Sequence, residues 1–354
     1  MVDVLQVAVL AGDGIGPEVV PVAMVAAEKA LAAQGIRVQW EMLPFGRSAI
    51  DSHGESMPTS TLDALDGFEM MVVGPHDSAS YPEPHRSAAP PGAVLRKHFG
   101  LYANLRPAQA IPHIPATAPD IDLLIVRENS EGLYADRNMA VGAGEFMPTP
   151  DVALSVGVVT RQASERIAER AFEAARTRRG HVTVVHKANV LRLTTGLFRD
   201  VCFEVAQRYP EVRVDQQHVD AMAALLVRRP GDFDVLVTEN LFGDILSDLA
   251  AELSGSLGLA SSINCSDTRV MAQAVHGAAP DIAGRGLANP LAMISSVASA
   301  LDWAATRRAD PRLAAAAASL RAGVAATVAA GVMTPDLGGI ATTSEFGDRL
   351  YSVL

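Results

Sequence analysis

Hydrophobic positions along this chain fall into two alternating kinds of segment. Short runs rich in β-branched residues predict strands at 4–10, 37–43, 69–74, 121–126, 153–159, 181–186, 212–219 and 233–238. Longer alanine-rich stretches between several of them, such as 17–34 and 164–178, predict helices, and the pattern after about residue 290 is mostly helical. This alternation predicts an α/β fold with a parallel or mixed sheet covered by helices.

The stretch AVLAGDGIGPEVV, residues 8–20, places alternating glycines after the first predicted strand. A dinucleotide-binding turn needs G-x-G-x-x-G, and Pro17 stands where its third glycine would be. Pro17 and Glu18 suit the first turn of a helix. The local pattern therefore predicts a strand–helix turn and not a Rossmann phosphate loop.

Composition narrows the class of protein. The 354 residues suffice for one large or two ordinary domains, and 40 acidic against 29 basic side chains give a formal charge of −11. That charge disfavours nonspecific binding to nucleic acid or to an anionic membrane. No run is apolar enough to span a bilayer, and the start lacks the basic residues of a signal peptide. Cys202 and Cys265 indicate neither a disulfide framework nor a zinc site, and Cys202 is expected in the core. We expect a soluble, cytoplasmic protein.

The segment TENLFGDILSDLAAELSGSLG, residues 238–258, has helical periodicity. Asp244 and Asp248 are four residues apart, so both carboxylates project from one side of the helix. This pair is typical either of a solvated helix face or of a site for a hard cation such as Mg²⁺, and Asp220 offers a third carboxylate. The apolar positions predict a core face formed by Phe242, Ile245, Leu246 and Leu249.

Arginines suggest a substrate with two or more carboxylates. Arg127 follows a predicted strand directly, at the strand end where open α/β sheets bind ligands. Arg106 precedes Pro107, which favours an extended backbone, and Arg96 lies ten residues earlier. Each alone is typical of a surface ion pair, but together they match the bidentate binding of carboxylates.

Two further side chains form a candidate acid–base pair. Lys187 follows the strand 181–186, and a lysine there can lose its proton when it is desolvated or near a metal. Tyr134 ends the motif VRENSEGLY, where a packing tyrosine is the alternative.

In the segment VHGAAPDIAGRGLANP, residues 275–290, small side chains would let a flat ligand approach the backbone, and Asp281 can accept hydrogen bonds from a ribose. An ordinary polar loop is the alternative there.

Seven motifs in order resemble one family over nearly the whole chain: GDGIGPEV, LYANLRP, VRENSEGLY, HKANVL, VDAM, NLFGDILSD and HGAAPDIAGRGLANP. They are similar to the metal-dependent β-decarboxylating 2-hydroxyacid dehydrogenases, the isocitrate and isopropylmalate dehydrogenase family. The resemblance implies a two-domain, isopropylmalate-dehydrogenase-like α/β fold with a central mixed sheet, unlike a Rossmann fold. It places the first domain, on the cofactor side, at 1–103 plus 256–354. The second domain, 104–255, would carry the metal and substrate side and the interface of a homodimer.

The resemblance also implies an activity. This is the NAD-dependent oxidative decarboxylation of a 3-substituted malate with Mg²⁺ or Mn²⁺, and a 3-isopropylmalate-like compound is the leading substrate. The metal would be held by Asp244 and Asp248 with Asp220 of the partner subunit, and the substrate carboxylates by Arg96, Arg106 and Arg127. Lys187 of the partner subunit would take the hydroxyl proton, and Tyr134 would protonate the product. The implied cofactor positions are Asn189, His276, Gly277, Ala279, Asp281, Ile282 and Asn289. In this family an Asp–Ile pair, here Asp281–Ile282, goes with NAD and a Lys–Tyr pair with NADP.

The sequence departs from the leucine-pathway pattern before the first arginine. Ala93, with Gly92, stands where such an enzyme carries a leucine, and the proline-rich loop 74–92 precedes it. Isocitrate, homoisocitrate and tartrate or malate therefore remain alternative substrates. A non-catalytic regulatory subunit is an alternative of another class, but such subunits typically lose metal or acid–base residues that this chain keeps.

Overall fold

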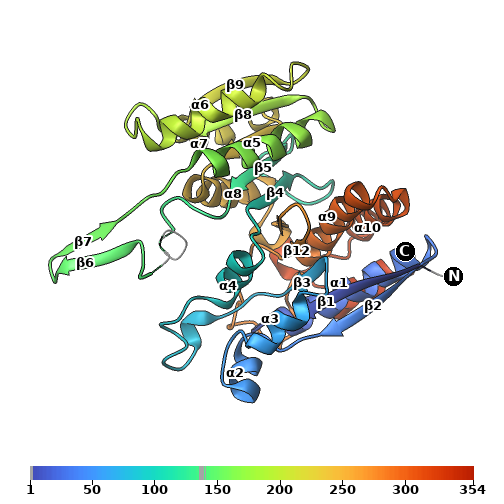
Figure 1. Ribbon diagram of the computed structural model, residues 1–354. Coiled ribbons are helices and arrows are strands. Elements are labelled where there is room, and N and C mark those ends of the chain that lie inside the picture. The colour runs from blue at the N-terminus through green and yellow to red at the C-terminus, as the bar shows by residue number, and fades with distance from the viewer. Residues whose placement is uncertain (1–2, 135–138, 140) are drawn as a thin grey trace. The chain divides into compact units, whose positions relative to one another are not determined.

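The computed structural model describes residues 3–134, 139 and 141–354. The chain forms two compact units, coloured along the chain in Figure 1. Unit 1 comprises Met1–Leu95, Ile111–Pro115 and Gly255–Leu354, and unit 2 comprises Arg96–Ala110 and Ala116–Ser254. Both units combine a sheet with helices, so the predicted α/β class is confirmed.

Unit 1 contains a mixed sheet in the order β2-β1-β3-β12-β11. Strands β1, β2, β3 and β12 run parallel, whereas β11 is antiparallel to β12. Helix α1 packs against α9, α10 and α11, so both ends of the chain build this unit. The strands are β1 (Asp3–Leu10), β2 (Ile36–Met42), β3 (Met70–Val73), β11 (Ile263–Cys265) and β12 (Val270–Ala272). The helices are α1 (Gly16–Ala32), α2 (Arg47–His53), α3 (Thr59–Leu65), α9 (Leu291–Arg308), α10 (Pro311–Ala329) and α11 (Thr343–Val353), and α4 (Pro91–His98) follows the loop after β3.

Unit 2 contains a mixed sheet in the order β4-β5-β10-β8-β9. Strand β4 is antiparallel to β5, and the other neighbours are parallel. Helices α5 and α6 pack together against these strands, as do α7 and α8, which explains why β8 and β10 are buried throughout. The strands are β4 (Ala103–Gln109), β5 (Asp122–Glu128), β8 (His181–His186), β9 (Arg213–His218) and β10 (Val235–Thr238). The helices are α5 (Arg161–Arg176), α6 (Thr194–Ala206), α7 (Val219–Arg228) and α8 (Asn240–Ser254).

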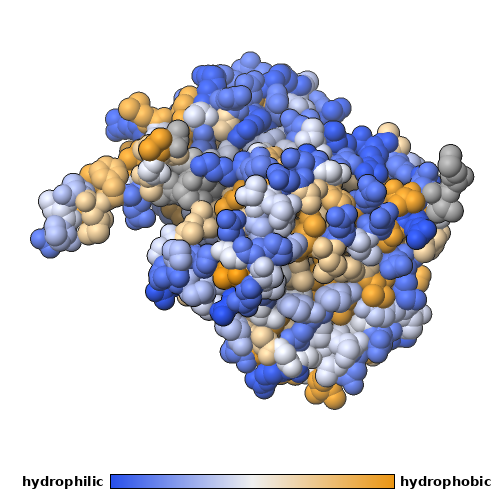
Figure 2. Space-filling model, turned by 60° about the horizontal axis from the view of Figure 1, so that its bottom comes forward, coloured by the Kyte–Doolittle hydropathy of each residue, from blue (hydrophilic) through white to orange (hydrophobic). Residues whose placement is uncertain are grey.

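A two-stranded hairpin belongs to unit 2 but packs little against it. Strands β6 (Glu145–Thr149) and β7 (Val152–Ser155) pair only with each other and are exposed along their whole length. Figure 1 shows the hairpin projecting from the rest of unit 2, and Figure 2 shows apolar residues along it. The exposed apolar side chains there are Phe146, Met147, Val152 and Leu154.

Most of the predicted elements are confirmed, with three physical differences. The run 153–159 leaves the strand after Ser155, because the chain there turns to the bridge between Gly132 and Val158. Strand β4 was not predicted, since Pro107 interrupts its apolar pattern, yet Pro107 lies within the antiparallel register opposite Leu124. The short strands β6, β11 and β12 were also not predicted.

The predicted core face of the helix at 238–258 is confirmed at Leu246 and at Leu249, which packs against the core, but it is wrong at Ile245. Leu246 is fully buried, but Ile245 is 57% exposed. Besides Leu246 and Leu253, the buried face of α8 carries small side chains, among them Gly243, Ser247 and Ala250. These small residues let the helix pack against strands β4 and β5, whereas Ile245 lies on the opposite, exposed side of the helix.

The two cysteines are free and buried, so the expected core position of Cys202 is confirmed. Burial also raises the pKa of the Cys202 thiol, which makes it unreactive. Within the described residues, no helix combines the length and the apolar character needed to cross a bilayer.

Candidate active site

Arg127, near the end of β5, is held in place by the first turn of α8. Its side chain is 6% exposed. Its Nε and Nη2 atoms both donate to Asn240 Oδ1, at 2.9 and 2.6 Å, and Asn240 Nδ2 donates to the Glu131 carbonyl at 2.9 Å. A Cβ atom at Gly243 would lie 2.7 Å from Arg127 Cγ, so only glycine admits this approach of helix and strand. The local sequence therefore fixes the direction of the guanidinium group.

Asp244 is the centre of the cluster. Its Oδ1 atom lies 2.5 Å from Arg127 Nη1 and 3.1 Å from Arg106 Nη1, and its Oδ2 atom accepts a hydrogen bond from the Tyr134 hydroxyl. Burial raises the pKa of Asp244, but Arg127, the Tyr134 hydroxyl and Arg106 outweigh burial, so the pKa lies below its ordinary value. Asp244 is therefore ionised at neutral pH.

Arg106 joins the second carboxylate to the first. The Nη1 atom that contacts Asp244 is also 3.5 Å from Asp248 Oδ1, and it donates to Ser247 Oγ at 2.6 Å. Burial raises the pKa of Asp248, with Asp244 adding to the effect and Arg106 opposing it. One positive group thus lies between two carboxylates, which shows that the pair converges on a single point as the i, i+4 spacing predicted.

Lys187 and Asp220 form a separate pair. Lys187 Nζ lies 2.6 Å from Asp220 Oδ1, and this bond lowers the pKa of the exposed Asp220 carboxyl. Lys187 follows β8 and Asp220 lies in the first turn of α7, as predicted. In the described ranges, no three His, Cys, Asp or Glu side chains converge as metal ligands, so one chain does not bring Asp220 to Asp244 and Asp248.

Arg96 lies in the last turn of α4 and is partly exposed. Ala93, one turn earlier on the same helix, is buried. Asn189 lies in the exposed turn that follows Lys187.

The turn between β1 and α1 packs tightly within unit 1. Gly12 and Gly14 have φ angles of 80° and 56°. A Cβ atom would lie 2.1 Å from the Pro75 carbonyl oxygen at Gly12 and 1.9 Å from the Ala278 carbonyl oxygen at Gly14. The glycines thus allow the turn to touch the loop after β3 and the segment 275–290, whose Ala278 carbonyl accepts the Ile15 N–H at 2.9 Å.

Glu18 also connects the start of α1 to the segment 275–290. Its carboxylate accepts the N–H groups of Gly284 and Gly286, at 2.5 and 2.9 Å. The expected place of Glu18 in the first turn of α1 is confirmed. The turn is therefore a structural support for the segment 275–290.

The segment 275–290 offers an open backbone and one buried nitrogen. Gly277, Gly284 and Gly286 have no atom within 4 Å of a Cβ position, so the backbone is accessible there. His276 Nε2 is buried and has no hydrogen-bond partner among the described residues, and burial lowers the pKa of the ring. Asp281 is exposed.

The other implied cofactor positions differ in exposure. Ala279 has a φ angle of 41°, and Ile282 is partly exposed. Asn289 is buried and already bonded, since its Nδ2 donates to Asp336 Oδ2 at 2.9 Å and its Oδ1 accepts the Leu291 N–H at 3.0 Å. Its amide thus supports the start of α9.

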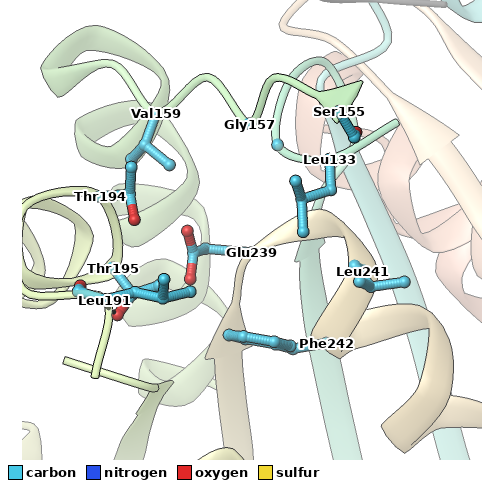
Figure 3. Close-up of a pocket in the computed structure, with 11 residues that line it drawn as sticks. Leu133, Ser155, Gly157, Val159, Leu191, Thr194, Thr195, Glu239, Leu241 and Phe242 are labelled. Atoms are coloured by element: carbon cyan, nitrogen blue, oxygen red, sulfur yellow. Dashed lines mark hydrogen bonds between the residues drawn. The ribbon is translucent and has the colours of Figure 1, made fainter. Parts of the chain in front are cut away.

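Sequence analysis missed Asn240, Ser247 and Glu239. Asn240 and Ser247 direct Arg127 and Arg106, and both lie beside the aspartates in the sequence. Their place on the same predicted helix as Asp244 could have indicated that they belong to the site. Nothing in the local pattern indicated that the Oε2 atom of Glu239 (Figure 3) is buried.

Comparison with known proteins defines the class. The sequence profile described as "Isocitrate/isopropylmalate dehydrogenase" matches residues 6–350. The chain is 40% identical to a 3-isopropylmalate dehydrogenase of Archaeoglobus fulgidus, covering 99% of each. It is 41% identical to an isocitrate/homoisocitrate dehydrogenase of Thermus thermophilus, covering 99% of this chain and 98% of the relative. A crystal structure of isocitrate dehydrogenase from Methylococcus capsulatus matches with a TM-score of 0.86 and 37% identity, covering 99% of each chain.

The chain is therefore a dehydrogenase. It belongs to the isocitrate/isopropylmalate dehydrogenase family, and the expected family and fold are confirmed.

Proposed function

We propose that this protein catalyses the NAD-dependent oxidative decarboxylation of a 3-substituted malate with Mg²⁺ or Mn²⁺. The observation that carries the proposal is the convergence of Arg106 and Arg127 on the carboxylates of Asp244 and Asp248. Two guanidinium groups suit a substrate with two carboxylates, and two aspartate oxygens suit a hard cation. A 3-isopropylmalate-like compound is the leading substrate, in line with the relatives that bear that name.

The residues present fit both the metal and the cofactor. Arg106 Nη1 places positive charge between Asp244 and Asp248, where a divalent cation would replace it. In the segment 275–290, the open glycine positions and the unpartnered His276 Nε2 suit a flat nucleotide ligand. We assign the cofactor to the domain formed by 1–103 and 256–354, and the metal and substrate to 104–255.

Each step of the reaction has a residue in this proposal. Arg96, Arg106 and Arg127 bind the substrate carboxylates. Lys187 would accept the hydroxyl proton as the C–OH carbon becomes a carbonyl, and NAD⁺, when bound, would supply the acceptor for the hydride that leaves this carbon. The β-carboxylate then leaves as CO₂, its bonding electrons stay on the remaining carbon, and Tyr134 supplies the proton to that carbon. A bound Mg²⁺ or Mn²⁺ supplies Lewis-acid polarisation and offsets the negative charge that develops.

We propose a homodimer with shared active sites. Within one chain Lys187 and Asp220 lie apart from the Asp244 cluster, so a second copy is needed to complete the site. The projecting hairpin (Figure 2) offers apolar surface for that copy, and the exposed Ile245 on α8 adds to it. We place the enzyme in the cytoplasm.

A substrate panel tests this function. NADH formation is measured with Mg²⁺ or Mn²⁺ on 3-isopropylmalate, isocitrate, homoisocitrate, tartrate and malate, with NADP in parallel. We expect turnover of 3-isopropylmalate with NAD. Isocitrate or homoisocitrate is the second candidate, because the small Ala93 stands where a leucine-pathway enzyme carries a leucine and because a relative bears that name. Binding of NAD and metal without any turnover would instead indicate a regulatory subunit.

Asn240→Ala tests the binding of the substrate by Arg127. The change leaves two buried guanidinium N–H groups without their acceptor, and such a loss costs about 1–3 kcal/mol. We expect KM for the hydroxy acid to rise by about 10–100-fold, with KM for NAD unchanged. Steady-state kinetics and the thermal unfolding midpoint check this, and equal rises in both KM values would contradict it.

Asp281→Lys tests the choice of cofactor. The carboxylate is exposed in the described structure and can accept bonds from a ribose diol, whereas lysine attracts a 2′-phosphate. We expect kcat/KM for NAD to fall by about tenfold or more and the NADP/NAD ratio to rise. Asp63→Lys, an equal charge change on exposed α3, is the control. An unchanged ratio would place recognition of the ribose elsewhere.

A further inference from the structure

The proline-rich loop 74–92 is attached to the turn between β1 and α1. The Asp13 N–H donates to the Pro75 carbonyl at 2.7 Å, at the beginning of the loop. The loop leads directly into α4, which carries Ala93 and Arg96. The proposed function gives no role to the turn or to the loop, although both stand out in the sequence.

The carboxylate of Asp13 makes a second attachment to the same loop. Its Oδ2 atom accepts the Asp77 N–H at 3.0 Å and the Tyr81 hydroxyl at 2.5 Å. Its Oδ1 atom accepts the Arg47 N–H at 2.7 Å. Hydrogen bonds to a carboxylate are shorter and stronger than those between neutral groups. One side chain thus connects three parts of unit 1, which are the turn, the loop 74–92 and the chain that enters α2.

Tyr81 is the point at which the loop enters the protein interior. Tyr81 is 2% exposed, whereas the segment 82–90 that follows it is exposed except for the partly exposed His85. Burial and the bond to Asp13 raise the pKa of the Tyr81 hydroxyl, and the charges of Asp13 and Asp77 add to the effect. The hydroxyl therefore keeps its proton and acts as a donor at neutral pH.

The exposed segment 82–90 is held mainly by bonds within itself. The Glu83 carboxylate accepts from Arg86 Nε at 2.9 Å and from Ser87 Oγ at 2.8 Å. Such surface bonds contribute little stability. The position of the segment on unit 1 is therefore set by Tyr81 before it and by the start of α4 after it.

Helix α4 has little apolar surface of its own to fix its position. Its buried residues are Pro91, Gly92, Ala93 and Leu95, of which Leu95 is the largest. Because glycine and alanine bury little apolar area, this face gives the helix little stabilisation. The loop that precedes α4 therefore helps to determine where the helix begins. Arg96 follows Leu95 directly, so a shift of the helix moves Arg96 as well.

We propose that Asp13 and Tyr81 are positioning residues for binding of the hydroxy acid. Their hydrogen bond holds the loop 74–92, and the loop in turn holds α4 with Arg96 in place. The proposal rests on the proposed function, which assigns Arg96 to a substrate carboxylate. The attachment of the loop by Tyr81 does not depend on that assignment and can be tested separately.

Limited trypsin digestion of the full-length protein tests the attachment without any substrate. Arg86 is exposed in the loop and Ser87 follows it, so trypsin can cleave there, and mass spectrometry identifies the fragment that ends at Arg86. Tyr81→Phe removes only the hydroxyl that donates to Asp13. Cleavage of a folded protein follows the population of locally opened chain, so we expect it to be about tenfold faster in this variant.

Tyr351→Phe is the matched control in the same unit. The Tyr351 hydroxyl donates to the Val22 carbonyl at 3.3 Å and so connects α11 with α1. Its loss removes a tyrosine hydrogen bond that does not involve the loop 74–92. This variant should be cleaved after Arg86 at the wild-type rate.

Steady-state kinetics separate a positioning role from a purely structural one. For Tyr81→Phe we expect KM for the hydroxy acid to rise about tenfold and kcat to change by less than about threefold. KM for NAD should stay unchanged, because the segment 275–290 keeps its bonds to Ile15 and Glu18. A purely structural bond would lower the thermal unfolding midpoint and leave both KM values unchanged, which is the pattern expected of Tyr351→Phe.

A double variant tests whether Asp13 and Tyr81 act through one bond. Asp13→Asn supplies a weaker, neutral acceptor, so this change alone should raise KM for the hydroxy acid. Combined with Tyr81→Phe, it should give less than the product of the two single effects, because the second change finds the bond already weakened. Combined with Tyr351→Phe, it should give the full product.

Three results would overturn the proposal. They are an unchanged rate of cleavage after Arg86 in Tyr81→Phe, faster cleavage with an unchanged KM for the hydroxy acid, and equal rises in both KM values. Wild-type protein that turned over no hydroxy acid of the panel would refute the proposed function alone. The cleavage rates would then still decide whether Tyr81 holds the loop.

Discussion

Lys187→Met is expected to lower the turnover number by about 10²–10⁴-fold while leaving NAD binding intact, because loss of a general base removes that much of the rate. The side chain has one described partner, Asp220, and methionine matches its length without its charge. Turnover with the hydroxy acid and calorimetric affinity for NAD are the two measurements.

Lys29→Met is the matched control, because Lys29 lies on the exposed side of α1 in unit 1. It should keep wild-type kinetics. Substantial residual turnover of Lys187→Met would remove Lys187 from the mechanism, and a parallel loss of NAD affinity would show that it binds the cofactor instead.

Asp244→Asn is expected to abolish the response to divalent metal and to lower turnover by at least about 10³-fold, since both metal chemistry and carboxylate alignment depend on it. The amide cannot offset the charges of Arg127 and Arg106, which are 6% and 13% exposed. The folded state should therefore lose about 1–3 kcal/mol. The unfolding midpoint with and without Mg²⁺ shows both effects.

Asp232→Asn provides the comparison for Asp244→Asn. Asp232 pairs with Arg229 at 3.3 Å on the surface, where such pairs contribute little. This variant should keep the Mg²⁺-dependent rise of the unfolding midpoint. If Asp244→Asn also kept that rise, the metal would be bound elsewhere.

Mixing the two inactive variants tests the shared site. A dimer of one Lys187→Met subunit and one Asp244→Asn subunit has one site with both native residues, provided that each site draws Lys187 from the partner. Random reassociation should then restore about a quarter of wild-type turnover, because half of the dimers carry one intact site. Failure to recover activity, with heterodimers present on a native gel, would place both residues in sites of a single subunit.

The sequence predicted the parts of the site that follow from local spacing. The i, i+4 pair Asp244 and Asp248 converges on Arg106, as helical geometry requires. Arg127 lies near the end of β5, as its position after an apolar run indicated. Pro17 and Glu18 start α1.

The features that the sequence analysis missed depend on contacts between distant segments. The exposed Ile245 was expected in the core, because helical periodicity does not show which of two faces carries the small residues that pack on a strand. The environment of the Glu239 carboxyl group, whose Oε2 atom is buried, depends on segments around residues 133, 159 and 194 (Figure 3). Asn240 accepts a hydrogen bond from Arg127, which lies 113 positions away in the sequence, so only the folded structure shows this contact.

Because unit 1 is formed by both ends of the chain, it can fold only after the C-terminal segment has been synthesised. All segments of unit 2 have been synthesised once Ser254 is added, whereas β1 and α1 pack against α9, α10 and α11, which are synthesised later. The bond from Gly284 to Glu18 spans 266 positions, a separation that slows folding. At a synthesis rate of about 5–20 residues per second, β1 and α1 remain for many seconds without the helices that pack against them. A premature stop codon that removed α9, α10 and α11 would therefore leave the N-terminal part of unit 1, Met1–Leu95, without the helices that pack on α1.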